Sequence, residues 1–84
     1  MNPARDATQK LSHLPSIYDQ EDGRDRMRIE FCRNKVCKAD VIAALGHEWS
    51  QHLDDYESGG DIYMDFTNHK SNGFILSVVF RKCK

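Results

Sequence analysis

Three segments of the chain, residues 26–32, 61–67 and 74–82, alternate between apolar and polar positions. This period of two is typical of a β-strand that buries one face. The third segment is apolar on both faces, so we expect it at the centre of a sheet. The other two strands then flank it, each antiparallel to it and parallel to each other, and a right-handed crossover connects them.

A helical period marks residues 39–57, where apolar side chains recur at spacings of three and four. This arc predicts one long helix that covers the sheet and ends at Gly59-Gly60. Gly46 falls inside this helix at a cost of about 1 kcal/mol relative to alanine. The apolar arc consists of Val41, Ile42, Leu45, Trp49, Leu53 and Tyr56.

A narrower apolar stripe predicts a short N-terminal helix, which Asn2 caps and Pro15 ends. We expect this helix to dock loosely on the sheet face that the long helix leaves open. Residues 16–25 are polar and predict a connecting loop. The expected fold is therefore α+β in a single small domain, 1–84. The short helix and its loop occupy residues 1–22 and precede a β-α-β-β core over residues 26–83. The sheet of this core is expected to have three strands, antiparallel or mixed, with the last strand at its centre.

The composition narrows the class of protein. The chain has 84 residues, a net charge of −1 and three cysteines. It contains no apolar run of about 18 residues that would span a membrane and no apolar signal segment, so we expect a cytoplasmic protein. An odd cysteine count without secretory context favours free thiols in a reducing compartment.

Although the net charge is only −1, the charged residues are strongly segregated along the chain. Residues 24–38 carry a net charge of +4, whereas residues 40–65 hold seven acids and no Lys or Arg. The acidic stretch fits either a solvated helix face neutralised by the basic strands or a docking surface for a basic protein partner. The candidate partner-binding residues are Glu48, Asp54, Asp55, Glu57, Asp61 and Asp65.

These features favour a non-catalytic interaction protein. In its small size and lack of a recognisable motif, the chain is similar in type to phage-encoded inhibitors of bacterial defence nucleases, anti-CRISPR proteins among them. That likeness implies occlusion of a basic site on a nucleic-acid-binding machine. An alternative is a nucleic-acid-binding protein that uses a basic sheet face with an aromatic side chain. The residues for that alternative are Arg24, Arg26, Arg28, Arg33, Lys35, Tyr63 and Arg81.

Cys32, Cys37, His47 and His52 form a Cys-x4-Cys-x9-His-x4-His series that suggests tetrahedral zinc. The central spacing is shorter than the usual ~12 residues. The two histidines, five apart on the expected helix, point about 140° apart. We therefore expect no metal and no cofactor, although zinc stays open for the nucleic-acid alternative. A thiol enzyme centred on Cys37 is the least favoured hypothesis, and a homodimer through strand edges is a further option.

Overall fold

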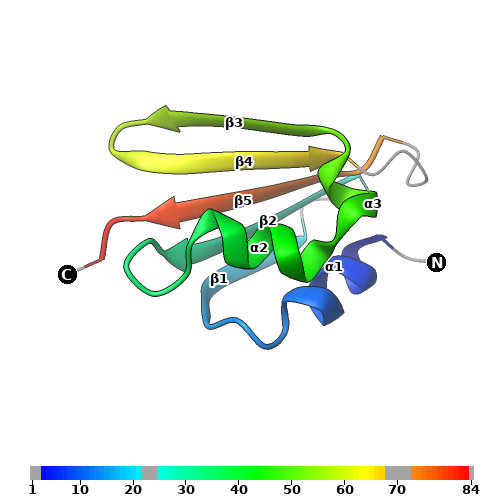
Figure 1. Ribbon diagram of the computed structural model, residues 1–84, viewed down its shortest axis with the longest axis horizontal. Coiled ribbons are helices and arrows are strands. Elements are labelled where there is room, and N and C mark those ends of the chain that lie inside the picture. The colour runs from blue at the N-terminus through cyan, green and yellow to red at the C-terminus, as the bar shows by residue number, and fades with distance from the viewer. Residues whose placement is uncertain (1–2, 22–24, 68–72, 84) are drawn as a thin grey trace.

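The computed structural model describes residues 3–21, 25–67 and 73–83. Within them the chain forms a small α+β fold with three helices and a five-stranded mixed sheet (Figure 1). The helices are α1 (Pro3–Leu11), α2 (Lys38–Leu45) and α3 (His47–Ser50). The strands are β1 (Ser16–Glu21), β2 (Arg26–Cys32), β3 (Leu53–Ser58), β4 (Asp61–Thr67) and β5 (Ile75–Arg81).

The sheet has five strands in the order β1-β2-β5-β4-β3, so the predicted count of three is wrong. The prediction of a central last strand is confirmed. β4 pairs antiparallel with β5, as expected. The prediction that β2 also runs antiparallel to β5 is wrong, because the two pair in parallel from Arg26↔Ile75 to Cys32↔Arg81. The reason is the β3–β4 hairpin, which the sequence analysis missed. It turns the chain around once more, so β4 runs opposite to β2, and β5 then runs the same way as β2.

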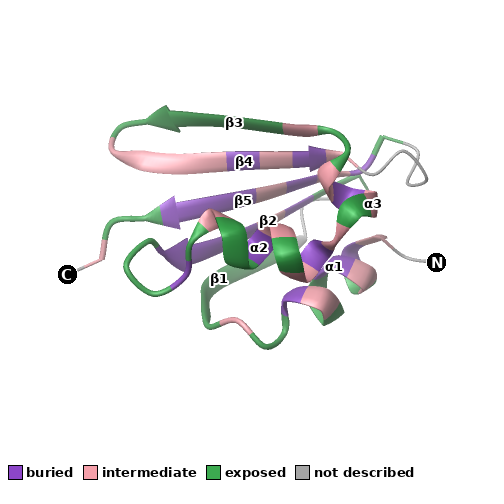
Figure 2. Ribbon diagram, viewed as in Figure 1, coloured by how far each residue is buried: buried purple, intermediate pink, exposed green. Residues whose placement is uncertain are grey.

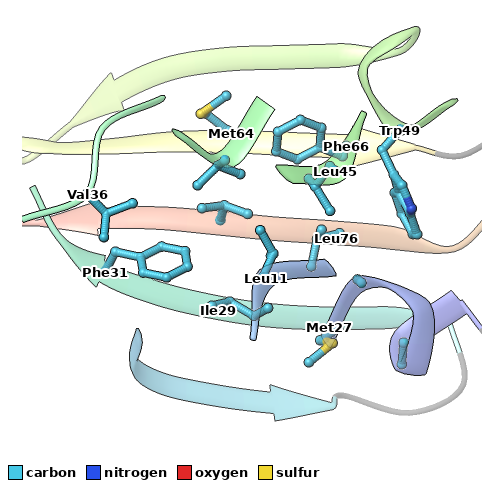
Figure 3. Packing of buried hydrophobic residues seen from close by; sticks show 14 of the residues in the cluster. Leu11, Met27, Ile29, Phe31, Val36, Leu45, Trp49, Met64, Phe66 and Leu76 are labelled. Carbon is cyan, nitrogen blue, oxygen red and sulfur yellow. The ribbon is translucent and has the colours of Figure 1, made fainter. Parts of the chain in front are cut away.

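All three helices lie on one face of the sheet (Figure 1). The expectation that the N-terminal helix covers the other face is wrong. Ala7 and Leu11 of α1 are buried in the same hydrophobic cluster as Leu45 of α2 and Ile29 of β2. Figure 3 shows Leu11 beside Ile29, on the same side of the sheet as Leu45. Among the described residues no helix covers the opposite face.

Trp49 ties α1 to α3 at one end of this core. Its side chain is fully buried and meets Phe74 edge to face, with 6.2 Å between ring centroids. Its indole Nε1 donates a hydrogen bond of 2.9 Å to Oδ2 of Asp6, which also pairs with Lys10 at 3.1 Å. Burial alone would raise the pKa of Asp6. The hydrogen bonds from Trp49 and Lys10 and the charge of Lys10 outweigh burial, so the pKa is lowered.

The predicted helix over residues 39–57 is wrong in its second half. α2 ends at Leu45 because Gly46 takes φ +80° and ψ −179°, a conformation nearly confined to glycine. After the single turn of α3 the chain becomes extended, and β3 pairs antiparallel with β4. Gly59 and Gly60, with φ of +60° and +85°, do not stop a helix but make the two-residue turn of this hairpin.

The polar segment expected to be a loop is largely the edge strand β1, which pairs antiparallel with β2. Figure 2 shows that both edge strands, β1 and β3, are mainly exposed, whereas β2 and β5 are mainly buried. Asn2 and Arg24 lie outside the described residues. No described helix has the length and apolar character needed to cross a membrane.

Candidate functional site

The sheet face opposite the helices is the larger of two candidate surfaces, and we call it the open face. Because side chains alternate along each strand, the open face takes the positions between the core residues. Val79 is fully buried but stands outside the helix-side cluster, as expected for the centre of this face. The sequence analysis assigned Arg26, Arg28, Tyr63 and Arg81 to one sheet face, and the strand register agrees. Ile75 and Val79 share this face.

The arginines of the open face are largely engaged with carboxylates of the same face. Glu30 is only 9% exposed and accepts hydrogen bonds from Arg28 Nε at 2.9 Å and from Arg81 Nη1 at 3.1 Å. Arg81 Nε also pairs with Asp61 Oδ2 at 3.2 Å. The two guanidinium groups thus compensate a nearly buried carboxylate, and the positive charge of the face is reduced.

Three tyrosines lie in one row across the open face. The strand register aligns Tyr18, Glu30, Val79, Tyr63 and Tyr56 from β1 to β3. The rings of Tyr56 and Tyr63 stack with centroids 5.1 Å apart and an interplanar angle of 2°. The charge of Asp65 raises the pKa of the Tyr56 hydroxyl, and burial adds to this shift. The row therefore has one tyrosine at its β1 end and two stacked tyrosines at its β3 end, on either side of Glu30 and Val79.

The second candidate surface is the acidic edge, which we define as Asp54, Asp55 and Glu57 of β3 together with Asp65 of β4. The three β3 residues are exposed, and they lie on an edge strand rather than on the expected helix. Asp55 pairs with Lys38 of α2 at 3.1 Å. Asp54 and Asp65 stand directly opposite each other in the register, where like charges repel.

A hollow of about 390 Å³ opens beside this carboxylate pair. Ser77 Oγ donates a hydrogen bond of 2.9 Å to Asp65 Oδ1, which fixes that carboxylate. The exposed Arg26 also lines this hollow. The hollow is lined by Arg26, His52, Leu53, Asp54, Asp65, Thr67 and Ile75. Its acidic wall suits a cationic group.

The other predicted residues lie away from these two surfaces or within internal contacts. Glu48 is half-buried on α3, and Asp61 forms an ion pair with Arg81. Arg33 Nη1 donates a hydrogen bond of 2.7 Å to the carbonyl oxygen of Gly60. Arg33 and Lys35 are exposed in the turn after β2. The basic set proposed for nucleic acid is therefore not one continuous patch.

The cysteines depart from the sequence expectation. Cys32 and Cys83 form a disulfide, so the expectation of three free thiols is wrong. The parallel pairing of β2 and β5 brings them together, because it places the carboxyl ends of both strands at one edge of the sheet. With Cys32 in the disulfide, the Cys-His zinc series loses a ligand. Among the described residues no group of three or more potential ligands could hold a metal ion.

Cys37 is the remaining cysteine, and it is exposed just before α2. Its thiol Sγ donates to Asp40 Oδ2 at 3.3 Å, and its backbone N–H donates to the same oxygen at 3.0 Å. The backbone hydrogen bond first, and the thiol second, lower the pKa of Asp40. The thiol of Cys37 is thus held against the carboxylate of Asp40 at the start of α2.

Sequence reasoning missed Tyr18 and Tyr56 as members of the open face. Tyr18 had been assigned to a loop and Tyr56 to the apolar arc of a helix. The Gly59-Gly60 pair, followed by a clear strand, was the signal that could have found β3 and hence Tyr56.

A comparison of the chain with protein-family models, with curated proteins and with solved structures found no match. The functional argument therefore depends on the chemistry of the two surfaces.

Proposed function

We propose that this protein is a non-catalytic binding module whose acidic edge docks a basic surface of a protein partner. The observation that carries this proposal is the exposure of Asp54, Asp55 and Glu57 on both sides of one edge strand. Asp54 also faces Asp65, a like-charge contact that costs stability and that a cationic partner would relieve. Among the described residues only Asp55 of this surface has an ion pair, with Lys38.

An acidic surface of this kind accelerates encounter with a basic partner and suppresses wrong partners. Basic grooves are typical of proteins that bind nucleic acid, because they neutralise phosphates. The proposal therefore includes inhibition of such a machine by occlusion of its basic site, in the manner of phage-encoded inhibitors. It also includes a cytoplasmic place of action. Because cytoplasmic thiols are kept reduced, binding has to be measured with the Cys32–Cys83 disulfide formed and reduced.

Binding of single-stranded nucleic acid to the open face is the second candidate. The row of Tyr18, Tyr63 and Tyr56 favours it, because each ring could stack on a base. The charges of the face oppose it. Arg28 and Arg81 are already paired with carboxylates, and the acidic edge repels phosphate.

The test is a comparison of two matched double variants. Asp54→Lys with Glu57→Lys cancels the net charge of the acidic edge and leaves the Asp55–Lys38 ion pair in place. Asp19→Lys with Asp25→Lys makes the same change in net charge at exposed positions elsewhere. Each protein is immobilised and exposed to a nuclease-treated extract of the producing cells, and the affinity for a retained protein is measured as salt is raised.

We expect the β3 variant to lose the partner, the matched control to keep it, and the wild-type affinity to fall steeply with salt. Equal binding by both variants would refute the acidic edge. Loss of all binding after nuclease treatment, with direct retention of a single-stranded oligonucleotide, would favour the second candidate.

A further inference from the structure

The open face has the composition of an interface, although no helix in the described part of the chain covers it. Val79 at its centre is fully buried, with Glu30 and Tyr63 as its neighbours in the row. At the two ends of this row stand Tyr18, 43% exposed, and Tyr56, 48% exposed. These are two of the three large apolar or aromatic side chains that are exposed among the described residues. The face thus combines an aromatic row with a buried centre.

Charge divides this face into two halves about the central strand. Arg26, Arg28 and Glu30 lie on β2, on one side of β5, and together carry a formal charge of +1. Asp65 on β4 and Asp54 on β3 lie on the other side and line the hollow described above. A partner complementary to the face must therefore carry acid over β2 and base over β4.

The geometry points to a second copy of this chain as that partner, packed open face to open face. A twofold axis parallel to β5 places β2 of one copy over β4 of the other, and β1 over β3. One cross-strand row of this face then lies over the same row of the other copy in reverse order. That row consists of Gln20, Arg28, Ser77, Asp65 and Asp54. Arg28 of each copy keeps its Nε–H on Glu30 and meets Asp65 of the other copy with its Nη groups, so this contact occurs twice. Packed sheets lie about 10 Å apart, a gap that an arginine and an aspartate side chain span together.

The other symmetric arrangements fit less well. A twofold axis across the strands would set β2 on β2 and β4 on β4, so Asp65 of each copy would lie over the acid-bearing strand β4 of the other. Edge-to-edge pairing through β3 would bring two acidic edges together. The dimer we infer uses the open face, and β3 keeps its outer edge exposed.

The available area sets the strength of this dimer. Five strands at a spacing of about 4.8 Å and a strand length of about 20 Å give a projected area of ~480 Å² per copy. Two copies then bury roughly 1,000 Å², the lower end of specific interfaces. We expect a weak dimer whose population depends on protein concentration and falls as salt rises.

The experiment is sedimentation velocity on wild type and on the charge-reversed variants Arg28→Asp and Asp65→Arg. Wild type shifts from monomer to dimer as concentration rises. Each variant alone opposes like charges at both contacts and stays monomeric. An equimolar mixture restores both contacts, and native mass spectrometry finds one chain of each kind in the dimer.

Matched controls carry the same charge changes elsewhere. Lys35→Asp in the turn after β2 and Asp55→Arg on the helix side of β3 leave the dimer unchanged. A second test changes Gln20, which is exposed on the edge strand β1, so its substitution should not disturb folding. This test stays informative if Arg28→Asp or Asp65→Arg fails to fold. Gln20→Lys, facing Asp54 of the other copy, strengthens the dimer, and Gln20→Glu weakens it. Wild type that stays monomeric throughout, or a mixture no more associated than its components, overturns the proposal.

Discussion

Removal of the Cys32–Cys83 disulfide should destabilise the fold strongly. The bond joins residues separated by 51 positions, and this segment contains most of the sheet. The test uses a Cys37→Ser background, because the exposed Cys37 thiol could otherwise exchange with the bond. Cys32→Ser with Cys83→Ser in that background gives a form that cannot make the disulfide, which we call the open form; the form with the disulfide is the closed form.

The magnitude follows from loop closure. A crosslink that closes a loop of about 50 residues removes unfolded-state entropy worth about 4 kcal/mol at 25 °C. A small domain has a free energy of unfolding of about 5–15 kcal/mol, so the open form loses a large share of it. For a domain of this size the same loss lowers Tm by roughly 15–30 °C.

Urea and thermal unfolding, followed by the fluorescence of the buried Trp49, measure this difference between the closed and open forms. A thiol titration of the wild-type chain, unfolded without reductant, should find one free thiol. Three free thiols would refute the disulfide itself. A difference in unfolding free energy below about 1 kcal/mol would refute the argument from loop closure.

Three further changes test the core and its acid sensitivity. Trp49→Ala should cost about 3–5 kcal/mol in urea unfolding, because it empties a fully buried site; a loss below about 1 kcal/mol would contradict that burial. The folded-state pKa of Asp6 lies below its ordinary 3.8, so its contribution is present above about pH 4 and is lost as pH falls through the folded pKa. Asp6→Asn should therefore flatten the acid limb of the stability–pH curve, and an unchanged slope would count against the Trp49–Asp6 contact. Gly46→Ala should cost about 1–3 kcal/mol from backbone strain alone, since an added Cβ would meet no atom within 4 Å; an unchanged Tm would contradict the positive φ.

The parts of the fold that sequence reasoning identified are those with a buried face. β2, β4 and β5 alternate because one side of each packs on the helices, and α1 has a stripe because it packs on β2. The edge strands have no such signal. β3 is exposed on nearly every residue, and its acids are poor strand formers, so Leu53 and Tyr56 fitted the helical period of Leu45 and Trp49 by coincidence.

The candidate site was foreseen in part for the same reason. Arg26, Arg28 and Arg81 were correctly assigned to one sheet face, because their strands were recognised. Their ion pairs with Glu30 and Asp61 depend on strand neighbours and on register, which the period of a single strand does not reveal. The pairing of Asp54 with Asp65 likewise required the hairpin.

The parallel pairing of β2 with β5 has a consequence for how the chain acquires its structure during synthesis. Every β2–β5 pair joins residues 49 positions apart, as in Met27↔Leu76. β5 is the last described strand to leave the ribosome, yet it occupies the middle of the sheet. Until it emerges, the apolar faces of β2 and β4 have no strand between them, so the nascent chain should depend on chaperones over that interval. Contacts of such sequence separation also predict slow folding for a protein of this length.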